Sequence, residues 1–152
     1  MHRHVRAART DDLDAIVGFQ QAMAAETEDK ALDGTVVAEG VRRLLDMPGA
    51  GFYLVAEVDD RVVGSLMVTH EWSDWRNGWF WWVQSVYVTA PYRRRGIYRA
   101  LYEAVKVRAT DAPDVRGFRL YVERENRNAR STYEALGMFE TAYRLYEQGA
   151  EA

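Results

Sequence analysis

Hydrophobic residues near the start of the chain recur at the spacing of one helix face. This spacing predicts a helix over residues 12–27, with Thr10 or Asp11 as its N-cap. The predicted buried face consists of Leu13, Ile16, Val17, Gln20 and Met23. A short strand over residues 4–8 is expected before this helix, and a second helix over residues 36–45 is expected after an acidic, polar loop.

The pattern then changes to runs that are rich in β-branched and aromatic residues. Residues 51–58 and 61–70 are two such runs, joined by a pair of aspartates that is a strong hairpin signal. A third run covers residues 79–88 and ends before Pro91. Successive strands with short connections predict an antiparallel meander.

The rest of the chain alternates helices and strands. The predicted elements are a helix over 96–109, a strand over 118–122, a helix over 128–136 and a strand over 142–147. The full order β-α-α-β-β-β-α-β-α-β indicates an α+β fold with a mixed, mainly antiparallel central sheet flanked by helices. We expect a single domain over residues 1–148 and a short tail over residues 149–152.

Composition restricts the classes of function. Apolar residues make up 48% and charged residues 28% of the chain, which is typical of a globular protein. The net charge of −3 provides no basic field for nucleic acid. The absence of cysteine excludes disulfides, thiol nucleophiles and thiolate metal sites, and we expect no bound metal. No signal peptide or membrane-spanning run is recognisable, so a cytoplasmic protein is expected.

The stretch from Val86 to Leu101 carries the strongest chemical signal. It has the pattern of a strand, a basic loop with Gly96 and the start of a helix. The first amides of a helix have no internal partner and lie at the positive end of the helix dipole, so they can bind a pyrophosphate. Positive charge is added by Arg93, Arg94, Arg95 and Arg99. A solvated surface turn is the alternative interpretation, and the lysine and hydroxyl of a Walker-type loop are missing.

The segment Arg93-x-x-Gly96-x-Tyr98 resembles the Arg/Gln-x-x-Gly-x-Gly/Ala loop of the GNAT acetyltransferases. The resemblance implies that the loop amides hold the pyrophosphate of CoA. It also implies that the backbone of the preceding strand pairs with the pantetheine arm. Tyr98 departs from the family pattern, in which a small residue is usual, so its ring must point away from the phosphate.

A second motif resembles the family pattern Asn-x-x-Ala-x-x-x-Tyr-x-x-x-Gly-Phe. Asn126, Ala129, Tyr133 and Gly137 match it, whereas Met138 stands where the family has phenylalanine. Gly137 is also a natural helix C-cap. The resemblance makes Tyr133 the candidate catalytic acid, which would donate a hydrogen bond to the departing thiolate; a core tyrosine on an amphipathic helix is the alternative. The implied cofactor-binding residues are Val86, Tyr87, Val88, Arg93, Arg94, Arg95, Gly96, Ile97, Tyr98, Arg99 and Asn126.

The general base is less well indicated. Many members of this family carry a glutamate on the strand before the loop, where this chain has Gln84, which cannot accept a proton. Weak candidates elsewhere are Glu26, Glu28, Glu71, Asp74 and His70.

Tryptophans are crowded around the predicted hairpin before the loop. They are Trp72, Trp75, Trp79, Trp81 and Trp82. They can bind a cationic amine by cation–π contact, form a core face or form a dimer patch. The adjacent Trp81 and Trp82 must point to opposite faces of the sheet.

The resemblance implies an acetyl-CoA-dependent N-acetyltransferase that acts on a primary amine of a small molecule or peptide. The absence of cysteine fits direct transfer without an acyl-enzyme. The alternative is a noncatalytic acyl-CoA-binding or sensor domain, which would keep the loop and not need the missing glutamate. No nucleic-acid or membrane partner is expected, and a homodimer fits the habit of the family.

Overall fold

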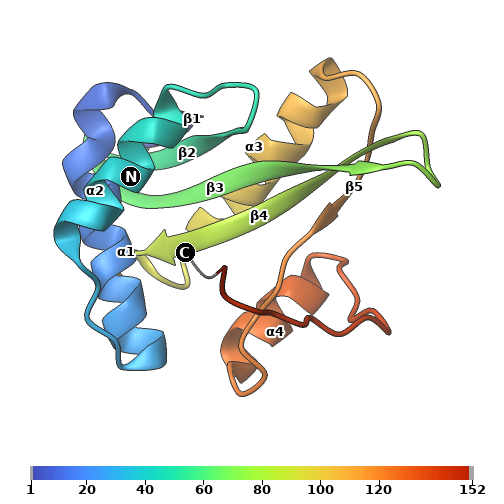
Figure 1. Ribbon diagram of the computed structural model, residues 1–152. Coiled ribbons are helices and arrows are strands. Elements are labelled where there is room, and N and C mark those ends of the chain that lie inside the picture. Colours follow the sequence, from blue (N-terminus) through green and yellow to red (C-terminus); the bar gives the residue numbers. More distant parts are fainter. Residues whose placement is uncertain (1, 151–152) are drawn as a thin grey trace. The chain divides into compact units, whose positions relative to one another are not determined.

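A computed structural model describes residues 2–150 of the chain (Figure 1). The chain divides into two compact units, one that ends at Tyr121 and one that begins at Val122. We call them the sheet unit and the C-terminal unit. Of the predicted tail over residues 149–152, residues 151 and 152 lie outside the described part. Within residues 2–150, no helix has the length and apolar character needed to cross a bilayer.

Among the described residues, five strands form the sheet in the order β1-β2-β3-β4-β5. Their bounds are β1 Arg3–Ala7, β2 Gly51–Val58, β3 Arg61–Ser73, β4 Gly78–Val88 and β5 Val115–Arg119. Neighbouring strands are antiparallel except β4 and β5, which are parallel. The predicted meander and the mixed sheet are therefore confirmed, because tight turns join β2, β3 and β4 whereas a helix connects β4 to β5.

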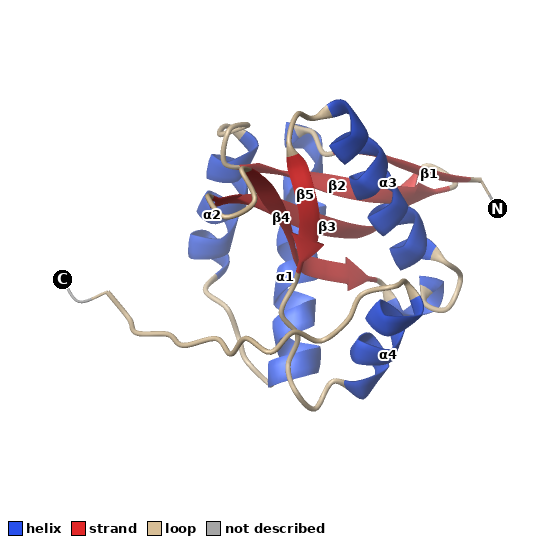
Figure 2. Cartoon of the chain, turned by 90° about the vertical axis from the view of Figure 1, so that its right-hand side faces the viewer, coloured by secondary structure: helices blue, strands red, loops and turns tan. Residues whose placement is uncertain are grey.

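Helices cover both faces of this sheet (Figure 2). Helices α1 Leu13–Glu28 and α2 Gly34–Leu45 lie on one face, and α3 Ile97–Asp111 lies on the other. On the α1 face, the core joins Ile16 and Val41 to Val55 of β2. The helical spacing of apolar residues thus buries one stripe of each helix against the alternating residues of the strands.

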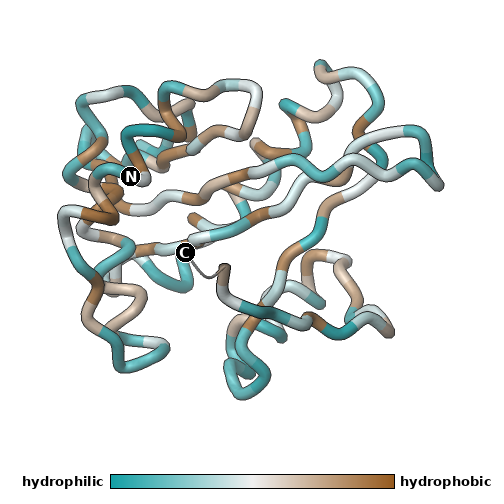
Figure 3. The backbone as a smooth tube through the Cα atoms, in the orientation of Figure 1, coloured by the Kyte–Doolittle hydropathy of each residue, from teal (hydrophilic) through white to brown (hydrophobic). Residues whose placement is uncertain are grey.

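In each strand and helix, the buried residues recur at the period of that element. Leu54, Leu66 and Val68 on the strands and Leu101 and Val105 on α3 are exposed by 1% or less. Hydrophilic residues gather at the turns, for example at the tip of the β3–β4 hairpin (Figure 3). The helices predicted over residues 12–27 and 96–109 are confirmed with small shifts of their ends.

The strand predicted over residues 118–122 is wrong in its bounds, because β5 covers Val115–Arg119. Its register with β4 explains the shift. Gly117 lies opposite Phe80, and a Cβ at position 117 would come within 2.7 Å of the Phe80 ring. Strand β5 thus requires glycine at position 117, although a glycine in the sequence usually indicates a turn or a break in a strand.

The C-terminal unit has one helix among its described residues, α4 Arg127–Ala135. The side chain of Asn126 caps this helix by accepting a hydrogen bond from the N–H of Ala129 at 3.2 Å. At the other end, Gly137 has a φ of 96°, and the N–H groups of Gly137 and Met138 donate to carbonyl groups of the last turn. This arrangement confirms the helix C-cap predicted at Gly137.

The strand predicted over residues 142–147 is also wrong, since residues 138–150 form neither helix nor strand. A strand needs a neighbour that pairs its N–H and C=O groups. The described residues of the C-terminal unit contain no other strand that can do so. Alternation of apolar and polar residues is therefore not sufficient to form a strand at residues 142–147.

Candidate functional site

The basic loop lies between the end of β4 and the start of α3. A single turn, η2 Ala90–Tyr92, follows the strand and contains Pro91. Arg94 and Gly96 then adopt positive φ angles of 62° and 78°. Positive φ angles of this kind occur in anion-binding nests, in which successive N–H groups point towards one site, so residues 94–96 form a candidate nest. Gly96 is also the N-cap of α3, so the amides of the first helical turn follow directly after this nest.

Two of the predicted site residues turn their side chains into the fold. The side chain of Ile97 is buried, with 2% exposure. The ring of Tyr98 stacks on that of Tyr102, one turn further along α3, with centroids 6.2 Å apart and planes inclined by 15°. Any contact of these two residues with a ligand on the loop would therefore come from their backbone amides.

The first arginine of the loop is held by residues that lie outside it. Nε of Arg93 donates to the carbonyl oxygen of Val88 at 2.8 Å, and Nη2 donates to Oε1 of Glu26 at 2.7 Å. Glu26 lies in the last turn of α1 and also accepts a hydrogen bond from the hydroxyl of Tyr87. The guanidinium of Arg93 lies 5.3 Å from the centroid of the Tyr87 ring. Helix α1, strand β4 and the loop are thus joined in one network.

This network fixes the charge of Glu26. Hydrogen bonds from Tyr87 and Arg93 lower the pKa of the Glu26 carboxyl below its ordinary value. Burial and the hydrogen bond to Glu26 raise the pKa of the Tyr87 phenol. Glu26 is therefore ionised at neutral pH and, as a group with a lowered pKa, is a poor general base.

A second residue reaches the loop from β1. Nη1 of Arg3 donates to the carbonyl oxygen of Arg95 at 2.7 Å. A Cβ added at Gly96 would lie 3.1 Å from the same nitrogen. Sequence reasoning missed Arg3 because 92 positions separate it from Arg95 and no local pattern marks it.

Strand β4 continues beyond its pairing with β5. The pairing ends where Trp82 lies opposite Arg119, whereas β4 continues to Val88. Ser85 has a φ of 53° at a β-bulge, where the register of β4 against β3 shifts. Within the described sheet unit, residues 83–88 have no strand partner on the β5 side. This stretch contains the predicted residues Val86, Tyr87 and Val88.

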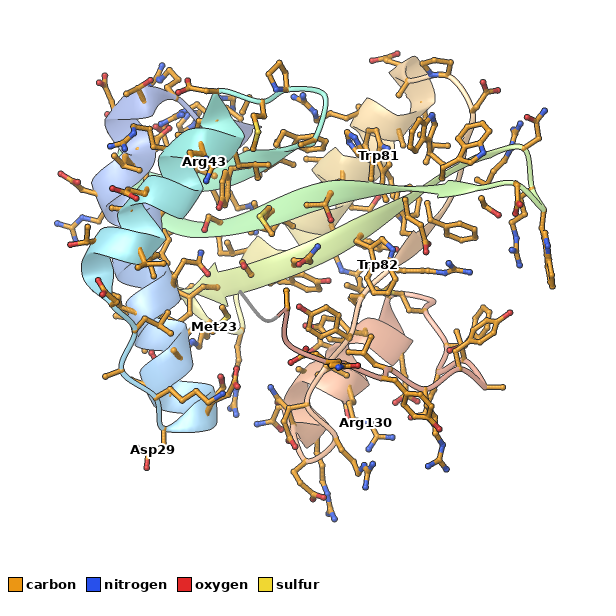
Figure 4. All side chains as sticks on the ribbon, viewed as in Figure 1. Met23, Asp29, Arg43, Trp81, Trp82 and Arg130 are labelled. Carbon is orange, nitrogen blue, oxygen red and sulfur yellow. The ribbon has the colours of Figure 1, made fainter. Side chains whose placement is uncertain are left out.

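Successive side chains of β4 alternate between the two faces of the sheet. Trp81 and Trp82 leave the strand in opposite directions, as predicted (Figure 4). Trp81 is 7% exposed, and its ring packs against Phe52 and His70. On the opposite face, the indole N–H of Trp82 donates to Glu71 at 3.1 Å. The exposed members of the tryptophan group are Trp72, Trp75 and Trp79.

The other base candidates differ in their surroundings. Oε1 of Glu71 also accepts a hydrogen bond from Nη1 of Arg119 at 2.6 Å. Nδ1 of His70 lies 3.3 Å from a main-chain carbonyl, and its Nε2 is buried without a partner among the described residues. The amide of Gln84 donates to the hydroxyl of Thr69. Glu71 is thus the candidate carboxylate on the face of the sheet that carries Trp82 and Gln84.

The remaining predicted site residues belong to the C-terminal unit. Tyr133 lies in α4, and burial raises the pKa of its phenol above the ordinary value. A raised pKa keeps the hydroxyl protonated at neutral pH, so it can donate a hydrogen bond. Asn126 uses Oδ1 to cap α4, and its amide nitrogen keeps two donors.

Comparison with known proteins gives a family match. A model of the acetyltransferase (GNAT) family matches residues 12–138. The crystal structure of a possible acetyltransferase from Clostridium difficile 630 is 47% identical, with a TM-score of 0.91 and 100% coverage of both chains. Among curated proteins, no significant sequence match is found.

Two more distant structures share the fold. A predicted acetyltransferase from Clostridium acetobutylicum, solved with acetyl-CoA, is 13% identical at a TM-score of 0.79, covering 97% of this chain and 96% of its own. AAC(6')-Iy, in complex with the bisubstrate analogue CoA-S-monomethyl-acetylneamine, is 18% identical at a TM-score of 0.76, covering 99% of both chains. At these identities the likeness concerns the fold alone.

Proposed function

We propose a direct acetyl transfer from acetyl-CoA to a primary amine, on the premise that this chain belongs to the GNAT family of acetyltransferases. Membership makes the chain an acetyltransferase that uses acetyl-CoA. Our proposal goes further by assigning direct transfer, a small-molecule or peptide amine as acceptor, and named residues to each role.

The single observation that carries the proposal is the loop between β4 and α3. The positive φ angles of Arg94 and Gly96, together with the amides at the start of α3, form a cradle that suits a diphosphate. Arg94, Arg95 and Arg99 supply positive charge around it. The unpaired edge of β4 at residues 86–88 offers peptide groups to the pantetheine arm, as a sheet edge does to an added strand.

Tyr133 is assigned as the hydrogen-bond donor to the leaving sulfur. Bound acetyl-CoA supplies the acetyl thioester. The neutral amine nitrogen bonds to the acetyl carbon, the carbon–sulfur bond breaks, and the surplus proton on nitrogen passes to solvent or a base. A free thiol has a pKa of about 8.5 and an unperturbed tyrosine a pKa of about 10. Because burial raises the pKa of Tyr133 further, its role is to donate a hydrogen bond to the sulfur as charge develops.

The acceptor is proposed to be a cationic amine that loses its proton before attack. Glu71 and Trp82 present a carboxylate and an indole on one face of the sheet. Oε1 of Glu71 already accepts from Arg119 and Trp82, so a cationic ligand would use Oε2 and the indole ring. Gln84 cannot accept the proton. An α-amine with a pKa of about 8 therefore needs less assistance in losing its proton than a lysine-like amine with a pKa of about 10.4.

The proposal is tested by measuring release of the CoA thiol with a panel of polyamines, amino acids, aminoglycosides and short peptides. We expect release with at least one acceptor. Tyr133→Phe should then lower kcat about 100-fold, because the donor to the leaving group is lost. Its Kd for acetyl-CoA should stay close to that of the wild type.

Tyr146→Phe is the matched control. This tyrosine is 92% exposed in the same unit, so its substitution should leave kcat unchanged. Equal kcat values for Tyr133→Phe and the wild type would remove Tyr133 from the mechanism.

A noncatalytic acyl-CoA-binding or sensor domain is the second candidate. It is favoured by Gln84, whose amide donates to Thr69 at the position where many family members carry a glutamate. Calorimetric binding of acetyl-CoA without thiol release from any amine would support it. Absence of binding would reject both candidates.

A further inference from the structure

We propose that Arg3 and Glu26 are positioning residues that hold the phosphate loop in its binding shape. This inference rests on the proposed use of the loop for CoA. Neither residue belongs to the loop or to the motifs that resemble the family. Arg3 opens β1 and Glu26 lies at the end of α1, yet they reach opposite ends of the same short stretch, residues 93–95.

The hydrogen bond from Arg3 fixes the orientation of one peptide group in the loop. Nη1 of Arg3 donates to the carbonyl oxygen of Arg95 at 2.7 Å. In a trans peptide group the C=O and N–H bonds point in opposite directions. Anchoring this carbonyl therefore turns the N–H of Gly96 away from Arg3, and this N–H is one of the donors of the proposed cradle.

Glu26 fixes the other end through Arg93. The carboxylate accepts from Nη2 of Arg93 at 2.7 Å while Nε of the same guanidinium donates to Val88 at 2.8 Å. The hydroxyl of Tyr87 donates to the second oxygen of Glu26 and holds the carboxylate in place. Arg93 is thereby tied to both α1 and the end of β4, and acts by holding the loop.

Arg94 lies between these two anchored residues and has the least favourable backbone conformation of the loop. Its φ of 62° is disfavoured for residues with a Cβ atom. Such a conformation persists where the surrounding structure enforces it. The contacts of Arg93 and Arg95 on either side supply this enforcement, and the nest depends on it.

Both contacts lie at the surface, so they affect the loop more than global stability. The side chains of Arg93 and Glu26 are 43% and 41% exposed. Exposed ion pairs contribute little to the free energy of folding. Variants that lack one contact should therefore fold normally.

Removal of the Glu26 carboxylate distinguishes positioning from a simple charge effect, because the two predict opposite changes in the affinity for CoA. CoA is an anion, so removing a nearby carboxylate should strengthen its binding if charge alone matters. If Glu26 positions the loop, its removal lowers the fraction of molecules in the binding shape, and the apparent Kd rises in proportion.

The experiment is a calorimetric titration of the full chain with CoA. We expect Glu26→Ala and Arg3→Ala each to weaken binding roughly tenfold, as a tenfold loss of the binding-ready fraction would. Glu28→Ala is the control, because it removes the same charge from the same helix end but contacts Lys30 instead of the loop. It should bind CoA at least as tightly as the wild type, and all variants should keep the melting temperature of the wild type.

A second measurement distinguishes positioning from a general structural role. Amide hydrogen exchange at residues 94–98 of the free protein should be faster in Glu26→Ala than in the wild type. Glycine adopts positive φ without strain, so in an Arg94→Gly background the further change Glu26→Ala should weaken CoA binding much less. Binding by Glu26→Ala as tight as, or tighter than, the wild type would overturn the inference alone. Absence of CoA binding by the wild type would instead reject the proposed function.

Discussion

Gly96 and Gly40 are two glycines at which the same substitution meets very different surroundings. Gly96 has a φ of 78°, and a Cβ there would approach Nη1 of Arg3 to 3.1 Å. Gly40 lies inside α2, and a Cβ there would meet no atom within 4 Å. Alanine at position 96 is thus strained in both backbone and contact, whereas at position 40 it adds helix propensity.

We expect Gly96→Ala to lower the free energy of unfolding by about 1 kcal/mol and to weaken CoA binding roughly tenfold. The cause is the displacement of Arg3 and of the amides at the start of α3. Urea unfolding and calorimetry measure the two effects. Gly40→Ala, the control, should raise stability by about 0.5–1 kcal/mol and leave CoA binding unchanged. Wild-type affinity in Gly96→Ala would show that the proposed cradle does not depend on this backbone conformation.

At the scale of elements, one guanidinium ties β1 to the start of α1 and to β2. Arg6 donates to both carboxylate oxygens of Asp12 at 2.8 and 2.9 Å, and to Glu57 at 2.8 and 3.0 Å. Asp12 is only 4% exposed and also accepts the N–H of Arg9 at 2.7 Å. These bonds, led by that from Arg6, hold the pKa of Asp12 below its ordinary value of 3.8.

Asp12→Ala should lower the free energy of unfolding by about 3 kcal/mol at pH 7, because it leaves the charge of Arg6 partly unpaired. The pKa of Asp12 is lower in the folded than in the unfolded chain, so its contribution is complete above the unfolded value and is lost as pH falls through the folded one. The difference between wild type and variant should therefore shrink below about pH 4.

Urea unfolding between pH 3 and pH 7 measures this dependence. Asp11→Asn, at the exposed neighbouring position, serves as the control and should change stability little. A difference between Asp12→Ala and wild type that stays constant across this range would contradict the assigned ion pair.

At the scale of the whole molecule, the residues assigned to the reaction belong to both compact units. The loop and β4 lie in the sheet unit, and Tyr133 and Asn126 lie in the C-terminal unit. The family match crosses the boundary between them. A ligand that binds the folded chain and not the unfolded chain stabilises the folded state by mass action.

We expect CoA at about 100 times its Kd to stabilise the chain by about 2.7 kcal/mol. For a protein of this size, this corresponds to a rise in melting temperature of about 5–10 °C. A thermal unfolding scan with and without CoA measures it. Adenosine lacks the diphosphate that the loop is proposed to bind, so it should give no comparable shift. An equal shift with adenosine would place the binding outside the loop.

Several features were predictable because their signals lie within a few neighbouring residues. The opposite faces of Trp81 and Trp82 follow from the period of a strand, and the helix end at Gly137 follows from the freedom of glycine. Of the candidate site, the motifs indicated the loop and Tyr133. The wrong predictions concern pairing between distant segments. Strand β5 lies at Val115–Arg119 because Gly117 must fit beside Phe80. Residues 142–147 form no strand because the described part of their unit offers no partner strand.

By itself, the sequence determined the order of elements through β4, the position of the basic loop and the family to which its motifs point, since each depends on local period or spacing. Only the tertiary structure decided that Arg3 and Glu26 reach that loop, across separations of 92 and 67 residues. The physical reason is that such contacts depend on how strands and helices pack, and no pattern of neighbouring residues encodes which distant side chain arrives at a given carbonyl or guanidinium.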